Sequence, residues 1–60
     1  MENYVYIHIS DNKSFKKYFE FFNKAILFGS KHSAENSCKS ALIFKVNDEI
    51  NPICSFRTIL

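Results

Sequence analysis

The sequence predicts an α+β fold: a small β-α-β-β domain in which one amphipathic helix packs on a three-stranded antiparallel or mixed sheet. Three observations support this class. Residues 4–9 alternate with period two, residues 15–28 repeat aromatic side chains at helical spacing, and residues 41–60 carry two strand-like segments around a turn. A chain of 60 residues is long enough for one domain only, so residues 1–60 are expected to fold as a single unit.

The first element is expected to be a strand at residues 4–9, because its residues favour β structure throughout. Period-two alternation separates an aliphatic set on one face from an aromatic and polar set on the other: Val5, Ile7 and Ile9 against Tyr4, Tyr6 and His8. Turn-forming residues at 10–14 then separate this strand from the next element.

The second element is expected to be a helix from about residue 14 to Phe28. Asp11, Asn12 or Ser14 would accept hydrogen bonds from its first free N–H groups. At about 100° per residue, one stripe and its flanks collect the apolar side chains: Phe15, Phe19, Phe22 and Ile26, with Tyr18, Phe21, Ala25 and Phe28 beside them. Gly29 follows the last periodic residue, at the C′ position where a left-handed conformation favours glycine.

The remaining elements are expected to form a hairpin after a polar connection. Residues 30–39 are polar, and the stretch 33–40 is left open between a short helix and a loop, with a loop of at most one turn favoured. Residues 41–46 and 53–60 are rich in strand-forming residues, and turn residues separate them at 47–52. This pattern predicts two antiparallel strands joined as a β-hairpin.

One helix can cover only one face of this sheet, so the identity of the open face matters for function. The face expected beneath the helix is mainly aliphatic: Val5, Ile7, Ile9, Leu42, Phe44, Val46, Phe56 and Leu60. The open face is then expected to mix aromatic, aliphatic and basic groups: Tyr4, Tyr6, His8, Ile43, Lys45, Ile53, Ser55, Arg57 and Ile59. A mixed patch of this kind is typical of a contact surface.

Composition and charge argue against several function classes. The formal net charge of +2 is mild and spread along the chain, so no polyanionic partner is required. The longest apolar runs, residues 25–28 and 41–44, are far shorter than the roughly 18 residues of a membrane span. The first residues carry no secretory signal pattern, which predicts a cytoplasmic protein with reduced Cys38 and Cys54. Residue types with codons rich in A and T suggest a bacterial or phage origin, and hence the host cytoplasm for a phage-encoded chain.

The chain carries no pattern that predicts a cofactor or a metal site. The candidate ligands His8, His32, Cys38 and Cys54 do not stand in the short-spaced pairs that organise tetrahedral zinc. A glycine-rich phosphate loop needs several glycines, whereas Gly29 is the only one. We therefore expect a protein that is not an enzyme and that binds no cofactor.

The function that these observations favour is a small non-enzymatic interaction module. It would bind another protein and inhibit or regulate it, in the manner of an antitoxin or a phage-encoded antagonist. A second form of this hypothesis is a homodimer, in which the chain binds another copy of itself. The expected contact residues combine aromatic anchors with basic groups: Tyr4, Tyr6, His8, Phe21, Phe28, Lys45 and Arg57.

A first alternative is binding of single-stranded RNA or DNA by the open sheet face. The aromatic rings of the first strand would stack on unpaired bases, while Lys45 and Arg57 would hold phosphates. This mode of binding depends on the exposure of Tyr4, Tyr6 and His8.

A second alternative depends on one short segment. Gly29-Ser30-Lys31-His32 resembles the Gly-Ser-His segment of small messenger-RNA-cleaving toxins, with Lys31 placed between serine and histidine. The histidine of those toxins acts in RNA cleavage, so the resemblance implies a catalytic role for His32 in a small ribonuclease-type toxin.

Overall fold

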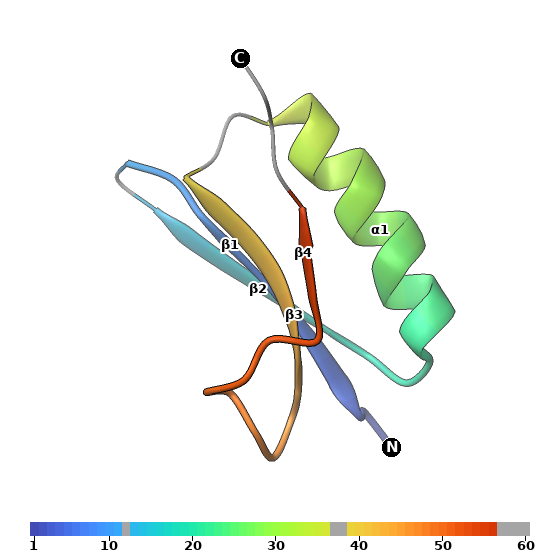
Figure 1. Ribbon diagram of the computed structural model, residues 1–60. Coiled ribbons are helices and arrows are strands. Elements are labelled where there is room, and N and C mark those ends of the chain that lie inside the picture. Colours follow the sequence, from blue (N-terminus) through green and yellow to red (C-terminus); the bar gives the residue numbers. More distant parts are fainter. Residues whose placement is uncertain (12, 37–38, 57–60) are drawn as a thin grey trace.

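In the residues that the structure describes, the protein consists of one helix packed on a four-stranded sheet. The computed structural model describes residues 1–11, 13–36 and 39–56, which Figure 1 shows as a coloured ribbon. The elements are, in chain order, β1 (Tyr4–Ile9), β2 (Ser14–Phe19), α1 (Phe22–Glu35), β3 (Ser40–Lys45) and β4 (Cys54–Phe56). The α+β class is confirmed, whereas the predicted three strands and β-α-β-β order are corrected to four strands in a β-β-α-β-β order.

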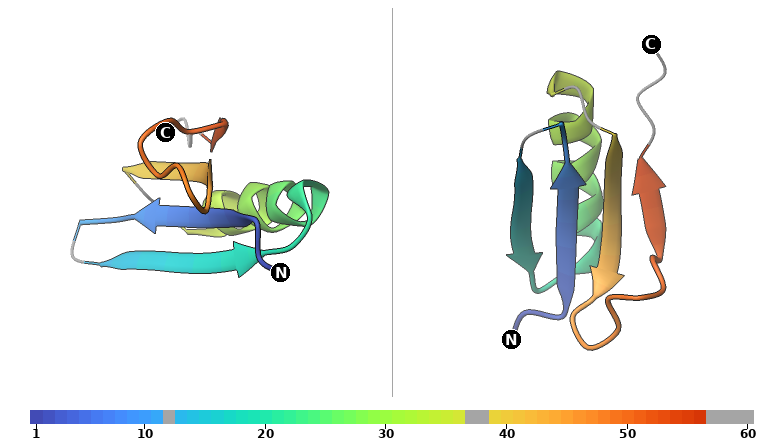
Figure 2. Two further views of the ribbon diagram at one scale, coloured as in Figure 1. Left: turned by 90° about the horizontal axis from the view of Figure 1, so that it is seen from below. Right: turned by 90° about the vertical axis from the view of Figure 1, so that its left-hand side faces the viewer.

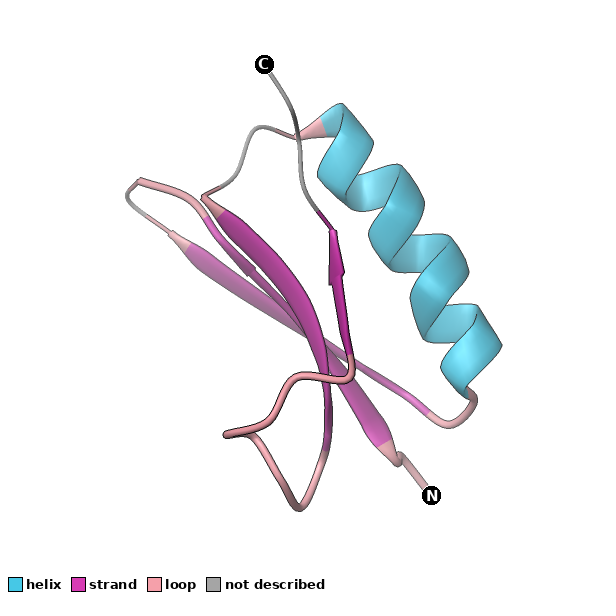
Figure 3. Cartoon of the chain, viewed as in Figure 1, coloured by secondary structure: helices cyan, strands magenta, loops and turns pink. Residues whose placement is uncertain are grey.

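The sheet is antiparallel throughout, with strand order β2-β1-β3-β4, so β1 and β3 lie in its centre. Helix α1 lies across one face, whereas the connection between β3 and β4 projects from the other face (Figure 1 and Figure 3). A view onto the face without the helix shows the strands side by side with α1 behind them (Figure 2). The molecule thus has two layers, and one sheet face carries no helix.

Residues 14–19, predicted as the first turns of the helix, form strand β2 instead. Phe15 and Phe19 are four positions apart, a spacing that places two side chains on one face of a helix and also on one face of a strand. The hairpin with β1 decides between these options, because the backbone N–H of Ser10 bonds to the Lys13 carbonyl at 2.9 Å and starts the ladder. Because residues 14–19 form a strand, the helix cap predicted at Asp11 or Ser14 is wrong, and Asn12 lies outside the described residues.

Helix α1 lies further along the chain than predicted, and residues 30–35, expected as loop, form its last turns. Its buried positions are Ala25, Gly29 and Ser33, which repeat every four residues along one stripe. These small side chains let the helix backbone approach the sheet closely. Gly29 therefore lies inside the helix rather than at a C′ position, and its φ is not positive. With 14 residues, α1 is too short to cross a membrane, and no described helix is long and apolar enough to do so.

For β1 and β3, the sheet face beneath α1 is the one that was predicted to be open, whereas the prediction that Phe56 of β4 lies beneath the helix is confirmed. Tyr6 and Ile43 have no exposed surface and form the core together with Ala25 and Ala41. The partly buried side chains packed against this core are Tyr4, Phe19, Ile26, Phe28, Cys54 and Phe56. The physical reason is complementarity of size, because the small stripe of α1 leaves room for the large Tyr6 ring.

The aliphatic set of β1 lies on the face without a helix, contrary to the prediction. Val5 lies between Tyr18 of β2 and Phe44 of β3 in the register, and both Val5 and Phe44 are buried. The β3–β4 connection projects from this side, and its Glu49 carboxylate lies 3.6 Å from the Lys16 ammonium on β2. This face is therefore only partly open to solvent.

The connection between β3 and β4 is organised around Asp48. Its carboxylate accepts hydrogen bonds from the Asn51 side-chain amide at 3.2 Å and from the Ile50 backbone N–H at 3.4 Å. These donors hold the pKa of Asp48 below its ordinary value because they stabilise the charged form, and the Asn51 side chain has the largest effect. The Asp48 backbone N–H donates to the Lys45 carbonyl at 2.9 Å and closes the turn. The antiparallel pairing of β3 with β4 confirms the predicted hairpin.

Candidate interaction surface

The seven predicted contact residues lie in different environments. Three of them, Tyr4, Phe21 and Lys45, lie at one end of the molecule. Tyr6 and His8 lie beneath α1, and Phe28 lies between α1 and β2. Arg57 lies outside the described residues. Tyr6 has no exposed surface and His8 only 5%, so the expectation that both lie on an open face is wrong. Because side chains alternate along β1, the orientation that buries Tyr6 and His8 turns Val5 and Ile7 away from α1.

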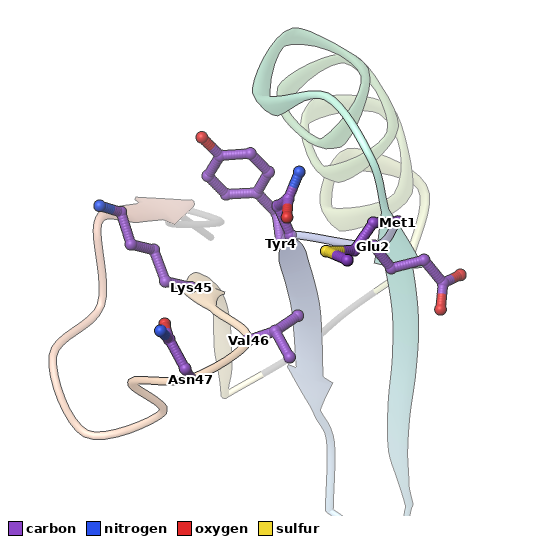
Figure 4. A pocket seen from close by; sticks show the side chains of 7 residues that line it. Met1, Glu2, Tyr4, Lys45, Val46 and Asn47 are labelled. Carbon is purple, nitrogen blue, oxygen red and sulfur yellow. The ribbon is translucent and has the colours of Figure 1, made fainter.

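The predicted residues Tyr4, Phe21 and Lys45 belong to a surface where β1 begins, β3 ends and α1 begins. We name it the basal surface and define it by six residues: Met1, Tyr4, Phe21, Phe22, Lys45 and Val46. The ring centroids of Tyr4 and Phe22 are 5.4 Å apart. Tyr4 and Lys45 are partners in the β1–β3 register, and Figure 4 shows both side chains around a hollow of about 400 Å³ that Val46 also lines.

Polar contacts join the first residues of the chain to the turn between β2 and α1. The Met1 amine lies 3.2 Å from the Glu20 carboxylate, and the Asn3 side-chain amide donates to the Glu20 carbonyl at 3.3 Å. Glu20 directly precedes Phe21 in the chain. These bonds therefore bring the beginning of β1 next to the start of α1.

The basal surface exposes large apolar side chains. The exposed fractions are 95% for Met1, 58% for Phe21, 39% for Phe22 and 36% for Val46. Phe21 occupies the N-cap position of α1 in an extended conformation, without a side-chain hydrogen bond to the helix. A polar residue would stabilise the helix better at this position. The local fold therefore does not account for the phenylalanine.

A second cluster, which we name the histidine cluster, consists of Tyr6, His8 and His32 and joins β1 to the last turns of α1. The Tyr6 hydroxyl lies 3.2 Å from Nδ1 of His8 and 3.2 Å from Nδ1 of His32. A phenol carries one proton, so it donates to one of these nitrogens, and the other nitrogen carries its own proton and donates to the phenol oxygen. For both contacts to be hydrogen bonds, the two neutral histidines must adopt opposite tautomers.

An aromatic stack lies beside the histidine cluster. The rings of Phe15, Phe28 and His32 are nearly parallel, with interplanar angles between 16° and 20° and centroid separations between 4.8 and 6.1 Å. The Lys17 ammonium lies 5.4 Å from the centroid of Phe28. Both histidines and Lys13 line a hollow of about 360 Å³ at this place. The arrangement therefore places two imidazoles and the Lys13 ammonium group around one hollow.

Metal binding has no support in the described ranges 1–11, 13–36 and 39–56, because they contain no group of three or more His, Cys, Asp or Glu side chains that could hold an ion. Cys54 is a half-buried thiol beside the core, and Cys38 lies outside these ranges.

Comparison of the chain with protein-family models, with curated proteins and with solved structures yields no match. The function is therefore inferred from the basal surface and the histidine cluster.

Proposed function

We propose that this protein is a non-enzymatic interaction module that binds another protein through the basal surface and thereby inhibits or regulates it. The supporting observation is the set of exposed apolar side chains at this end of the molecule, among them Phe21, whose ring adds little to the isolated fold at its position. Burial of apolar area contributes roughly 25 cal/mol per Å², so a partner that covers this group gains affinity. Aromatic anchors at the centre of a patch are typical binding hot spots.

The basal surface also indicates the chemistry of the partner. The rings of Tyr4, Phe21 and Phe22 would fit an apolar groove, and Lys45 at the edge of the hollow would pair with a carboxylate at the rim. In a second form of this proposal the partner is another copy of the chain, and the basal surface holds the homodimer together. We propose the cytoplasm as the location, and the host cytoplasm for a phage-encoded chain.

Nucleic-acid binding by a base-stacking sheet face has less support than protein binding. Tyr6 and His8 lie beneath α1 and do not present their rings to unpaired bases. Of the two cations expected to hold phosphates, Lys45 lies on the basal surface and Arg57 lies outside the described residues. An aromatic surface with one cation at its rim suits a protein partner better than a phosphate backbone.

Phe21→Ala is expected to weaken partner binding by at least about 2 kcal/mol, roughly 30-fold, because an exposed aromatic anchor is lost. The fold should be retained, since Phe21 is 58% exposed. The tagged protein is used to isolate its partner from cells of its source, and isothermal titration calorimetry of the purified pair gives the dissociation constants. Far-UV circular dichroism of the variant checks its folding.

Leu27→Ala is the matched control for this prediction. Leu27 is 68% exposed on α1 and lies outside the basal surface, so the substitution removes a comparable apolar group from another place. Equal losses of affinity in the two variants, or an unchanged affinity in Phe21→Ala, would contradict the proposal. Analytical ultracentrifugation of the purified chain tests the homodimer, which Phe21→Ala should dissociate.

A second candidate function, RNA cleavage, is supported by one specific observation. His32 and Lys13 line the same hollow, and an imidazole beside a cation suits general acid–base chemistry on a phosphodiester. The His32 imidazole would take the proton of a ribose 2′-hydroxyl as its oxygen attacks phosphorus. The imidazolium so formed would return this proton, through a water molecule, to the leaving 5′-oxygen, so that a 2′,3′-cyclic phosphate and a free 5′-hydroxyl result. Lys13 would hold the charged phosphate.

For this candidate, His32→Ala is expected to slow cleavage of single-stranded RNA by about 10²–10⁴-fold, the usual contribution of a general acid or base. Lys13→Ala should also slow the reaction. Lys24→Ala, which removes an exposed lysine of α1 that does not line the hollow, should not. Gel electrophoresis with detection of the cyclic phosphate provides the measurement. Absence of cleavage by the unmodified protein would remove this candidate.

A further inference from the structure

Strand β2 lies at an edge of the sheet, and the part of the chain that the structure describes places no strand on its outer side. All of its residues except Phe19 are exposed. An edge strand presents unpaired backbone donors and acceptors, and another chain can add to it as a further strand. β2 is therefore a second contact surface, separate from the basal surface.

The ladder of the β1–β2 hairpin indicates which backbone groups of β2 point outward. The Ser10 N–H bonds to the Lys13 carbonyl, and hydrogen-bonded pairs alternate with non-bonded pairs along an antiparallel ladder. Phe15 and Lys17 are then the residues that bond to β1. The residues that direct N–H and C=O groups to the outer edge are Ser14, Lys16 and Tyr18.

The outer edge is positively charged. Lys13, Lys16 and Lys17 lie in and next to β2, and the strand itself contains no acidic residue. Lys16 and Glu49 form an exposed pair at 3.6 Å, which contributes only about 0–1 kcal/mol, so a carboxylate of another chain can replace Glu49. The Lys17 ammonium lies 5.4 Å from the Phe28 ring centroid, on the side of α1. Lysines therefore flank the edge on both faces of the sheet.

Like charges disfavour a second copy of β2 as the occupant. In an antiparallel pair of β2 strands related by a two-fold axis, Lys16 and Lys17 of one copy would lie next to the same lysines of the other. Like charges opposite one another destabilise a strand pair, and lysines on an edge are a common protection against self-pairing. A segment with negative charge is therefore favoured over a second copy of β2 as the occupant.

We propose that β2 binds an extended acidic segment of another protein, which adds to the sheet as a fifth strand antiparallel to β2. Two consecutive acidic residues of this segment lie opposite Lys16 and Lys17, one on each face, because side chains of an extended chain alternate. Apolar residues next to the acidic pair lie against Phe15 and Tyr18, which are 40% and 41% exposed. The contact goes beyond the proposed function, since it uses another surface and recognises backbone and charge.

Short synthetic peptides test the charge requirement. A peptide with the centre Val-Glu-Glu-Val is expected to bind at least about tenfold more tightly than the matched peptide with the centre Val-Lys-Lys-Val, measured by fluorescence anisotropy of labelled peptides. The double variant Lys16→Glu, Lys17→Glu is expected to reverse this preference. Equal affinities of the two peptides for the unmodified protein would overturn the proposal.

Alanine and proline in place of Lys16 test the backbone contact. Lys16→Ala removes the charge only, whereas Lys16→Pro also removes an outward N–H and keeps the bonds to β1, as edge strands tolerate proline. The acidic peptide should bind Lys16→Pro at least about tenfold more weakly than Lys16→Ala. If Lys16→Pro does not fold, an acidic peptide N-methylated at both glutamates should show the same loss with the unmodified protein. Retained affinity would overturn the proposal.

Two further measurements distinguish the β2 contact from binding at the basal surface and from binding of nucleic acid. Phe21→Ala should leave peptide binding unchanged, so a failure of the basal surface and a failure of the β2 contact are distinguishable. A short single-stranded RNA should not displace the acidic peptide. Displacement by RNA at equal concentration would assign the lysines to nucleic acid and overturn the proposal.

Discussion

Replacing Gly29 by valine is expected to unfold the domain. A Cβ atom at Gly29 would lie 2.5 and 2.7 Å from the ring atoms Cε2 and Cζ of Phe56, and 3.1 Å from Cδ1 of Tyr6. A separation below 3.0 Å forces the neighbouring group to move. Phe56 lies on an edge strand and can turn aside at some cost, whereas Tyr6 is fully buried and bonded to two histidines.

The expected cost of this substitution exceeds the gain from removing a glycine. Valine stabilises a helix interior by less than about 1 kcal/mol relative to glycine, whereas overpacking a core typically costs about 1–3 kcal/mol and occasionally more. A core of this size rarely supplies more than about 3–5 kcal/mol of stability. Gly29→Val should therefore populate the unfolded state even without denaturant.

Urea unfolding followed by far-UV circular dichroism measures the effect. Ser30→Val is the matched control, because Ser30 is the next residue of α1 and is exposed. Its unfolding midpoint should stay close to that of the unmodified protein. An equal midpoint for Gly29→Val and Ser30→Val would show that α1 does not need a glycine against Phe56.

Replacing Tyr6 is expected to have the second large effect, and two variants separate its ring from its hydroxyl. Tyr6→Ala removes a ring whose centroid lies between 5.5 and 6.4 Å from those of five aromatic neighbours, and it should cost about 3–5 kcal/mol, enough to unfold the chain. Tyr6→Phe keeps the ring and removes the hydrogen bonds to His8 and His32. It should cost about 1–3 kcal/mol, because buried polar groups lose a partner.

Tyr18→Phe is the control for loss of a tyrosine hydroxyl. The Tyr18 side chain is 41% exposed on the face without a helix. The urea unfolding midpoint of Tyr18→Phe should therefore equal that of the unmodified protein. Nitrogen NMR of the histidine side chains provides a second measurement, in which the unmodified protein should show opposite tautomers of His8 and His32. Unchanged stability together with unchanged tautomers in Tyr6→Phe would contradict the bridging role of the hydroxyl.

Three of the four strands could be predicted from local pattern. The alternation of residues 4–9 predicts β1 with its observed bounds, and residues 41–46 predict β3 within one residue at each end. The last predicted strand, 53–60, contains β4, although residues 57–60 lie outside the described residues. These segments are rich in strand-forming residues and carry no competing helical period, so local preference and tertiary structure agree.

The second strand and the covered face could not be predicted. The spacing of Phe15 and Phe19 satisfies both periods, and only the pairing of β2 with β1 excludes the helix. Both faces of β1 are apolar enough to be buried. The choice between them depends on the small stripe at Ala25, Gly29 and Ser33, which exists only when α1 extends beyond Gly29.

The basal surface could be predicted in part. Tyr4, Phe21 and Lys45 are expected contact residues from the sequence, and they lie at one end of the molecule. Phe22 was expected in the buried helix stripe but is exposed, because α1 begins at this residue. Val46 was expected beneath the helix together with Phe44, but α1 covers the other face of the sheet. Element boundaries and the choice of the covered face therefore limited the prediction.

The histidine cluster has no local signal in the sequence. His8 and His32 belong to different elements and share no spacing pattern, and the packing of α1 on β1 is what brings both onto the Tyr6 hydroxyl. Such a cluster could be foreseen only if the buried face of β1 were known.

Local pattern establishes the α+β class, the places of β1, β3 and β4, and a surplus of aromatic side chains over what one small core can hold. These properties follow from period and residue preference within short segments. Contacts between distant segments settle the rest: β2 pairs with β1, α1 accepts the Tyr6 ring on its small stripe, and Phe21 remains exposed. The reason is steric, because the side of β1 that fits against small helix residues becomes the core and the other side does not.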